Sequence, residues 1–124
     1  MIDYLTVCEV LAIHKDQVDC YGGMHGLRDL GLLESALSRP RTGYYSDLVQ
    51  SAAALWESLA QNHPFVDGNK RTAFASAYTF LIINDVRIMA DPLATWDFIR
   101  DSCEFGRLQL NVLEAWLRDN VIYL

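Results

Sequence analysis

The apolar residues of this chain recur at intervals of three and four along almost its whole length. That spacing places them on one face of an α-helix, whereas a half-buried strand needs alternation at every second residue. The first such set predicts an amphipathic helix from about Asp3 to Val18, and its members are Tyr4, Leu5, Cys8, Leu11 and Ala12. No run alternates for long enough to build a sheet. The chain is therefore predicted to be all-α, a compact bundle of about six helices.

Five further helices are predicted from the same spacing and from their end signals. They span about 32–37 (stopped before Pro40), 47–62 (with Asp47 as N-cap), 69–83, 92–103 and 108–120. The segment 69–83 is apolar nearly all round, which is typical of a helix buried in the centre of a domain. Residues 86–89 are compatible with a short extended piece.

Size and charge limit the classes of function. A chain of 124 residues is the usual length of one domain, so residues 1–124 are predicted to form a single domain. The formal charge is −6 and the only lysines are Lys15 and Lys70. Because nucleic-acid binding depends on basic surfaces that neutralise phosphates, direct nucleic-acid binding is disfavoured. A small local anion site is not excluded.

Cysteine usage and hydropathy indicate the compartment. The three cysteines are Cys8, Cys20 and Cys103, an odd number without metal-ligand spacing, and they are predicted to be reduced thiols in the core. The N-terminus lacks the pattern of a signal peptide, and the longest nearly uncharged stretch, 72–84, is too short to span a bilayer. The protein is predicted to be cytoplasmic, without a membrane segment. Trp56, Trp96 and Trp116 are predicted to be core residues.

One segment, residues 63–71, carries chemistry, and it immediately precedes and begins the apolar helix. A helix N-terminus favours phosphate, and a glycine such as Gly68 allows close approach of the backbone to a ligand. Lys70 and Arg71 add positive charge for phosphate, while Asp67 supplies the hard oxygen that Mg²⁺ prefers. Imidazole exchanges protons near neutral pH, so His63 is a candidate general base. Together these roles indicate phosphoryl or nucleotidyl transfer.

Each residue of this segment also has a structural interpretation. A lone histidine before a helix is more often a hydrogen-bonding residue, and Asp67 taken singly would be an N-cap. Lys70 and Arg71 taken singly would be an exposed first turn. His25 is assigned as a turn residue, with a place near a nucleotide as the alternative. Arg28 either extends the cationic zone or is solvated. The coincidence of the chemical roles within nine residues favours the functional interpretation.

The segment HPFVDGNKR resembles the signature loop of the Fic/Doc superfamily, HxFx(D/E)GNxR, and is most similar to its death-on-curing (Doc) toxin branch. Residues 21–23, 26–29 and 31–40 are also similar to Doc-type sequences, so the resemblance covers essentially the whole chain. It implies a helical Fic/Doc-like fold that uses ATP with Mg²⁺ to modify a protein hydroxyl. The implied roles are general base for His63, Mg²⁺ ligand for Asp67, and nucleotide binding for Gly68, Asn69, Lys70 and Arg71.

The residue after Asn69 separates two branches of the resemblance. The AMP-transferring Fic branch has glycine there and a second arginine three residues after the first, whereas this chain has Lys70 and Phe74. This favours the Doc branch, and so implies a kinase that phosphorylates a Ser or Thr hydroxyl of elongation factor Tu and arrests translation. The alternatives are AMP transfer and a catalytically weak module that only binds its antitoxin. Cys20 and Gln61 replace basic residues of some relatives, so ATP affinity or target choice can differ.

Regulation is expected to come from another chain. The inhibitory pattern (S/T)xxxE(G/N) of many Fic proteins does not occur here. The resemblance to Doc implies an antitoxin of the prevent-host-death type, whose disordered C-terminal segment folds as a helix on the toxin.

Overall fold

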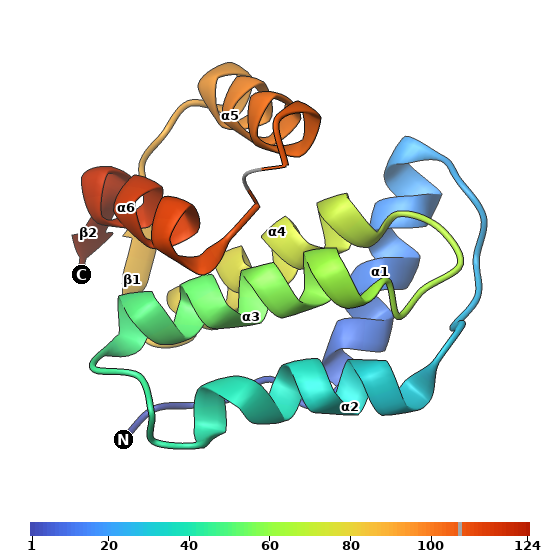
Figure 1. The fold of residues 1–124 in the computed structure, drawn as a ribbon, viewed down its shortest axis with the longest axis horizontal. Coiled ribbons are helices and arrows are strands. Elements are labelled where there is room, and N and C mark those ends of the chain that lie inside the picture. Colours follow the sequence, from blue (N-terminus) through green and yellow to red (C-terminus); the bar gives the residue numbers. More distant parts are fainter. Residues whose placement is uncertain (107) are drawn as a thin grey trace.

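The computed structural model describes residues 1–106 and 108–124, and within these ranges helices dominate (Figure 1). The α-helices are α1 (Val7–Tyr21), α2 (Leu30–Ser38), α3 (Leu48–Asn62), α4 (Asn69–Ile82), α5 (Pro92–Glu104) and α6 (Leu110–Asn120). A single 3-10 turn, Arg39–Arg41, continues α2. The predicted all-α class with about six helices is confirmed.

Capping residues fix the helix starts. Asp47 is the N-cap of α3, as predicted, and its side chain accepts the N–H of Gln50 at 3.0 Å. The first helix begins four residues later than predicted, at Val7. Thr6 and Glu9 form a reciprocal capping box there, which satisfies two otherwise unpaired N–H groups. A capping box is a more specific start signal than the spacing of apolar residues.

A small antiparallel sheet joins two distant segments. The strand β1 (Val86–Ile88) lies within the predicted extended piece, and it pairs with β2 (Val121–Tyr123), which the sequence did not predict. Three residues are too few for a period-two pattern to be recognised. The pairing places the C-terminal segment beside the residues that follow α4.

The core lies mainly between α3 and α4, which follow each other around the loop of residues 63–68. The helix α4 also contacts α1 and β1, as expected for a central helix. The helix with the most buried residues, however, is α3, with ten of fifteen against six of fourteen in α4. Tyr78 of α4 remains accessible, and so does Ile83, the C-cap residue of this helix.

An aromatic cluster attaches the C-terminal helices. Trp56 of α3 is fully buried and contacts the rings of Phe74, Phe98 and Trp116 edge to face. Phe98 of α5 stacks on Trp116 of α6 with ring centroids 4.8 Å apart. The prediction that Trp96 is a core residue is wrong, since it is 42% exposed. The physical reason is that α5 packs into the core through Phe98 and the buried Ile99, whereas the Trp96 ring borders an open cavity.

The cysteine prediction is also wrong for two positions. Cys8 and Cys20 are exposed, because each lies on the outer face of α1, and only Cys103 is partly buried. In the part of the chain that the structure describes, no helix has both the length and the apolar character needed to cross a membrane.

Candidate active site

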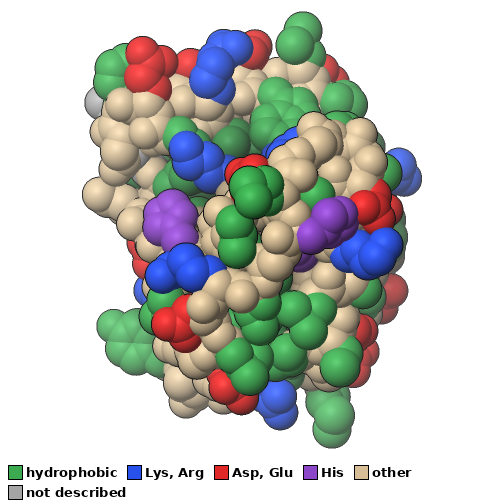
Figure 2. Space-filling model, turned by 90° about the vertical axis from the view of Figure 1, so that its right-hand side faces the viewer, with side chains coloured by type: hydrophobic (Ala, Val, Ile, Leu, Met, Phe, Trp, Pro, Cys, Tyr) green, Lys and Arg blue, Asp and Glu red, His purple; other side chains and the backbone are tan. Residues whose placement is uncertain are grey.

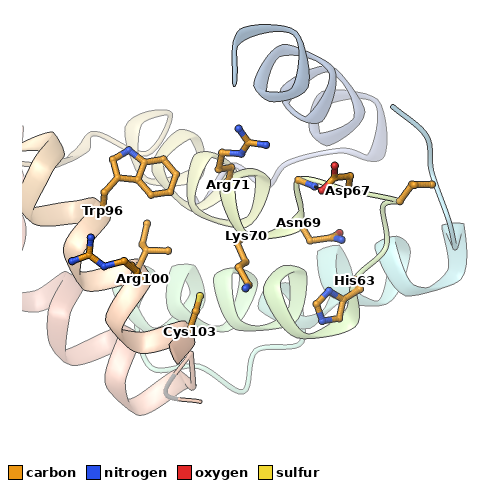
Figure 3. Close-up of a pocket in the computed structure, with 11 residues that line it drawn as sticks. His63, Asp67, Asn69, Lys70, Arg71, Trp96, Arg100 and Cys103 are labelled. Carbon is orange, nitrogen blue, oxygen red and sulfur yellow. Dashed lines mark hydrogen bonds between the residues drawn. The ribbon is translucent and has the colours of Figure 1, made fainter. Parts of the chain in front are cut away.

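A cavity of about 610 Å³ opens between the loop of residues 63–68, the first turn of α4 and one face of α5 (Figure 3). All six predicted site residues line it, together with four residues of α5. The lining residues are His63, Val66, Asp67, Gly68, Asn69, Lys70 and Arg71 on one side and Trp96, Ile99, Arg100 and Cys103 on the other. Figure 2 shows this end of the molecule, where basic, acidic and hydrophobic side chains border a hollow.

His63 ends α3 in a left-handed conformation, with φ 50°, and begins the loop. Its side chain is exposed and has no hydrogen-bond partner among residues 1–106 and 108–124, so the imidazole is available for chemistry. Its main chain is fixed by Arg28, whose Nε donates to the His63 carbonyl at 2.7 Å. A second guanidinium nitrogen of Arg28 donates to the carbonyl of Asn62 at 3.0 Å. Arg28 therefore satisfies carbonyls that a helix C-terminus leaves unpaired.

The connection between α1 and α2 holds the loop from outside. Pro64 accepts the N–H groups of Arg28 and Asp29 at 2.7 and 3.0 Å, and Val66 donates to the carbonyl of Gly26 at 3.0 Å. The two segments thus form a short antiparallel bridge. The Doc-like residues 26–29 therefore contact the signature loop directly.

Asn69 closes the loop from inside. Its Oδ1 accepts the N–H of Phe65 and its Nδ2 donates to the carbonyl of the same residue, both at 2.9 Å. Asn69, which is predicted to bind the nucleotide, therefore uses both polar atoms of its side chain to fix the shape of the loop. One N–H of its amide group is left for a ligand.

Asp67 carries the carboxylate of the site. Its Oδ2 accepts the N–H of Met24 at 3.1 Å and its Oδ1 accepts the N–H of Gly68 at 2.8 Å. Both hydrogen bonds lower the pKa of Asp67 below its ordinary value, and the bond from the Met24 N–H has the larger effect. The Asp67 side chain is therefore a carboxylate at neutral pH. The N-cap interpretation of Asp67 is wrong, because Gly68 is the N-cap of α4 and adopts φ 73°.

The surroundings of Asp67 fit a magnesium ion. Each of its oxygens accepts one hydrogen bond and keeps further lone pairs for a cation. Among the described residues, no three His, Cys, Asp or Glu side chains are grouped to hold a metal. A single carboxylate is sufficient for Mg²⁺ when substrate phosphates and water supply the other ligands.

The two cations of the segment have different environments. Lys70 points from α4 into the cavity, toward the space between His63 and Cys103 (Figure 3), and no ion-pair partner for it occurs in the described chain. Arg71 donates to the carbonyls of Tyr21 and Gly22 at 3.0 and 2.9 Å. Arg71 thus caps the C-terminus of α1, which has no basic residue in its last turn. Lys70 is the cation that is free to bind a ligand.

A glycine lets the α1–α2 connection reach the carboxylate. At Gly23, with φ 111°, an added Cβ would lie 2.8 Å from Oδ2 of Asp67. No side chain fits there without displacing the carboxylate. This gives a physical reason for a glycine at position 23, within the segment 21–23 that resembles Doc-type sequences.

Most of the residues that complete the site could not be recognised from the sequence. Arg28, for which the sequence leaves open a cationic zone or a solvated position, is exposed and fixes the main chain of His63. The four α5 residues of the cavity carried no motif, and only the packing of α5 brings them to the site. His25, in the connection between α1 and α2, is paired with Asp19 through Nε2 at 2.9 Å and does not line the cavity.

The chain is similar to known proteins over most of its length. The model of the Fic/DOC family matches residues 4–81. The chain is 51% identical over 96 residues to "Toxin Doc" of Mycolicibacterium smegmatis, covering 73% of this chain and 72% of that protein. It is 36% identical over 88 residues to "Protein kinase doc" of Escherichia phage P1, covering 68% of this chain and 70% of that protein.

Proposed function

The chain belongs to the Fic/DOC family, and on this basis we propose that it is the toxin of a toxin–antitoxin pair and acts as a protein kinase. The substrates would be ATP with Mg²⁺ and a Ser or Thr hydroxyl of a translation factor, with elongation factor Tu as the first candidate. The names of the two relatives support a toxin with kinase activity in general, since one relative is called a toxin and the other a protein kinase. The arrangement of groups in the cavity supports the chemistry.

His63 would act as the general base. Its unpaired, exposed imidazole can accept the proton of a target hydroxyl, while the hydroxyl oxygen forms a bond to the γ-phosphorus of ATP. The bond between the γ-phosphorus and the bridging oxygen breaks, and ADP leaves. The hydrogen bonds from Arg28 hold the main chain at His63 in place during this proton transfer.

Asp67 would hold Mg²⁺. A bound Mg²⁺ neutralises part of the charge on the nucleotide phosphates. The two main-chain N–H groups on Asp67 keep its carboxylate charged and oriented before any cation binds. The N-terminus of α4, which has no side-chain cap, lies beside Asp67 and favours the anionic phosphates of the nucleotide.

The observation that carries the choice of a kinase is the position of Lys70. Its ammonium group extends into the cavity without an ion-pair partner among the described residues, so it would contact the transferred phosphate directly. In the AMP-transferring pattern this position is glycine, which leaves space for a phosphate. A lysine side chain occupies that space, and this favours a nucleotide orientation that presents the γ-phosphate to His63.

The partner proposal follows from the same assignment. We expect a prevent-host-death antitoxin to inhibit the toxin, with a C-terminal segment that is disordered when free and folds on binding. Co-expression of this antitoxin should restore growth to cells that make the toxin.

The test is a label-transfer assay with purified protein, Mg²⁺ and elongation factor Tu, beside a bacterial extract. ATP labelled on the γ-phosphate is compared with ATP labelled on the α-phosphate, with His63→Ala as the control. The proposal expects a band labelled only from the γ position, which disappears in the variant.

Two other outcomes would contradict it. Label from the α position would identify AMP transfer, and the argument from Lys70 would be wrong. Absence of label from both, with growth arrest retained by His63→Ala, would identify a binding module instead of an enzyme.

A further inference from the structure

His14 lies on α1, far from the signature loop in sequence, and it does not line the cavity. It is 4% exposed, between the buried Val10 and Val18 on the same face of the helix. A buried imidazole loses its hydrogen bonds to water, and a hydrogen bond to the protein must replace them. The partner it finds is the main chain of the proposed metal-binding residue.

Two contacts attach His14 to the loop. Its ring stacks on the ring of Phe65, with centroids 3.8 Å apart and an interplanar angle of 5°. Its Nε2 lies 2.8 Å from the carbonyl oxygen of Asp67. Because a carbonyl oxygen only accepts, Nε2 must carry the proton and donate it.

This hydrogen bond sets the direction of the peptide group between Asp67 and Gly68. In a trans peptide the C=O and N–H point in opposite directions. With the carbonyl turned toward His14, the N–H of Gly68 faces the other side, where it donates to Oδ1 of Asp67 at 2.8 Å. A rotation of this peptide group would remove that donor from the carboxylate.

We propose that His14 is a positioning residue, which orients the Asp67–Gly68 peptide group and through it the carboxylate of Asp67. The loop and α1 are in direct contact at this point, since a Cβ built on Gly68 would lie 3.8 Å from Nε2 of His14 and 3.5 Å from Val18. His14 acts through Asp67 and does not touch the reacting groups. Its catalytic consequence rests on the proposed kinase function, whereas its effect on the peptide group does not.

Two substitutions separate the hydrogen bond from the packing. His14→Phe keeps a flat ring against Phe65 and removes the donor. His14→Gln keeps a donor at the position of Nε2, because its amide nitrogen lies at a similar distance from the backbone, and removes the ring. If His14 only fills the core, Phe should be the better replacement; if it positions the peptide group, Gln should be.

The first readout is the amide resonance of Gly68 in ¹H–¹⁵N spectra of the full chain without nucleotide. A donor to a carboxylate resonates downfield, and Asp67→Ala, which has no side-chain acceptor, supplies the reference for loss of that contact. We expect the Gly68 resonance to move toward the Asp67→Ala position in His14→Phe and to remain near the wild-type position in His14→Gln. Thermal melts of both variants establish that each is folded.

The second readout is kinase activity with Mg²⁺–ATP. Loss of a group that orients a metal ligand typically costs 10–100-fold. We expect kcat to fall by about that factor in His14→Phe and to be largely retained in His14→Gln. A Gly68 resonance unchanged in His14→Phe, or moved equally in both variants, would overturn the proposal. If the wild type transfers no phosphate, the proposed function fails, and the Gly68 resonance still decides the role of His14.

Discussion

The loop of residues 63–68 and the helix α5 face each other across one cavity, but different interactions attach them to the molecule. The loop is held through its main chain, by donors from Arg28, the α1–α2 connection, Asn69 and His14. The helix α5 is attached by side-chain packing, chiefly through Phe98 and Ile99 against the aromatic cluster of Trp56. In Figure 1 it lies at the margin of the bundle.

The difference suggests a division of roles. Main-chain hydrogen bonds fix direction as well as distance, so the loop suits groups that must be aligned with a reacting phosphate. Packing of apolar side chains is less directional and tolerates exchange of residues. We therefore expect changes in the loop to affect the rate of the chemical step and changes in α5 to affect the binding of the nucleotide.

The largest effect on activity is expected when Lys70, the cation without an ion-pair partner in the described chain, is removed. Lys70→Ala should lower kcat by roughly 10²–10³-fold, because a charge directed at the transferred phosphate is lost. The matched variant is Arg100→Ala, which removes a cation from α5 that already pairs with Asp97 at 3.0 Å. Steady-state kinetics with γ-labelled ATP measure both. If kcat fell equally in the two variants, the loop and α5 would not differ in their roles, and the proposed division would be wrong.

The next effect concerns stability. Arg28→Ala leaves the carbonyls of Asn62 and His63 without their side-chain donor. The free energy of unfolding should fall by about 1–2 kcal/mol, a range that already allows for the exposure of the Arg28 side chain. Arg100→Ala removes only exposed pairs within α5 and should cost about 0–0.5 kcal/mol. Urea unfolding at neutral pH measures both. A larger loss for Arg100→Ala would show that α5 is the more tightly attached side.

A smaller effect is expected at the exposed tryptophan of α5. Trp96→Ala should raise KM for ATP about tenfold, the equivalent of about 1.4 kcal/mol of lost apolar contact, with little change in kcat. The reason is that the indole ring borders the cavity as an apolar surface and is remote from His63 (Figure 3). Kinetics at several ATP concentrations separate the two constants. A fall in kcat at unchanged KM would contradict the assigned role of α5.

The smallest effect tests electrostatic contact across the cavity. Burial raises the pKa of the Cys103 thiol, and the charge of Lys70 lowers it in part. Alkylation follows the thiolate, so the rate for Cys103 should increase with pH above the ordinary range of cysteine. In a background with Cys8 and Cys20 replaced by serine, Lys70→Ala should slow the labelling a few-fold at fixed pH. Mass spectrometry follows the reaction, and an unchanged rate would mean that Lys70 does not influence α5.

The sequence by itself determined the helices, the family and one side of the site. Apolar spacing and the caps are local properties, and they place α3 and α4 within one residue of the predicted bounds. The six residues proposed for chemistry lie within one short segment, so their proximity followed from the chain itself. The predicted single domain, the general base and the metal ligand remain predictions.

Tertiary structure decided the opposite side of the cavity and the use of several polar groups. Trp96, predicted as a core residue, lines the site because α5 packs through its neighbours. Asn69 and Arg71 are predicted to hold phosphates, but their side chains donate hydrogen bonds to main-chain carbonyls. His14 and Arg28 reach the loop from other parts of the chain, and of the two only Arg28 lies in a segment that resembles Doc-type sequences. The physical reason is that a side chain's partner depends on which backbone groups remain unpaired after packing, and local sequence does not encode that.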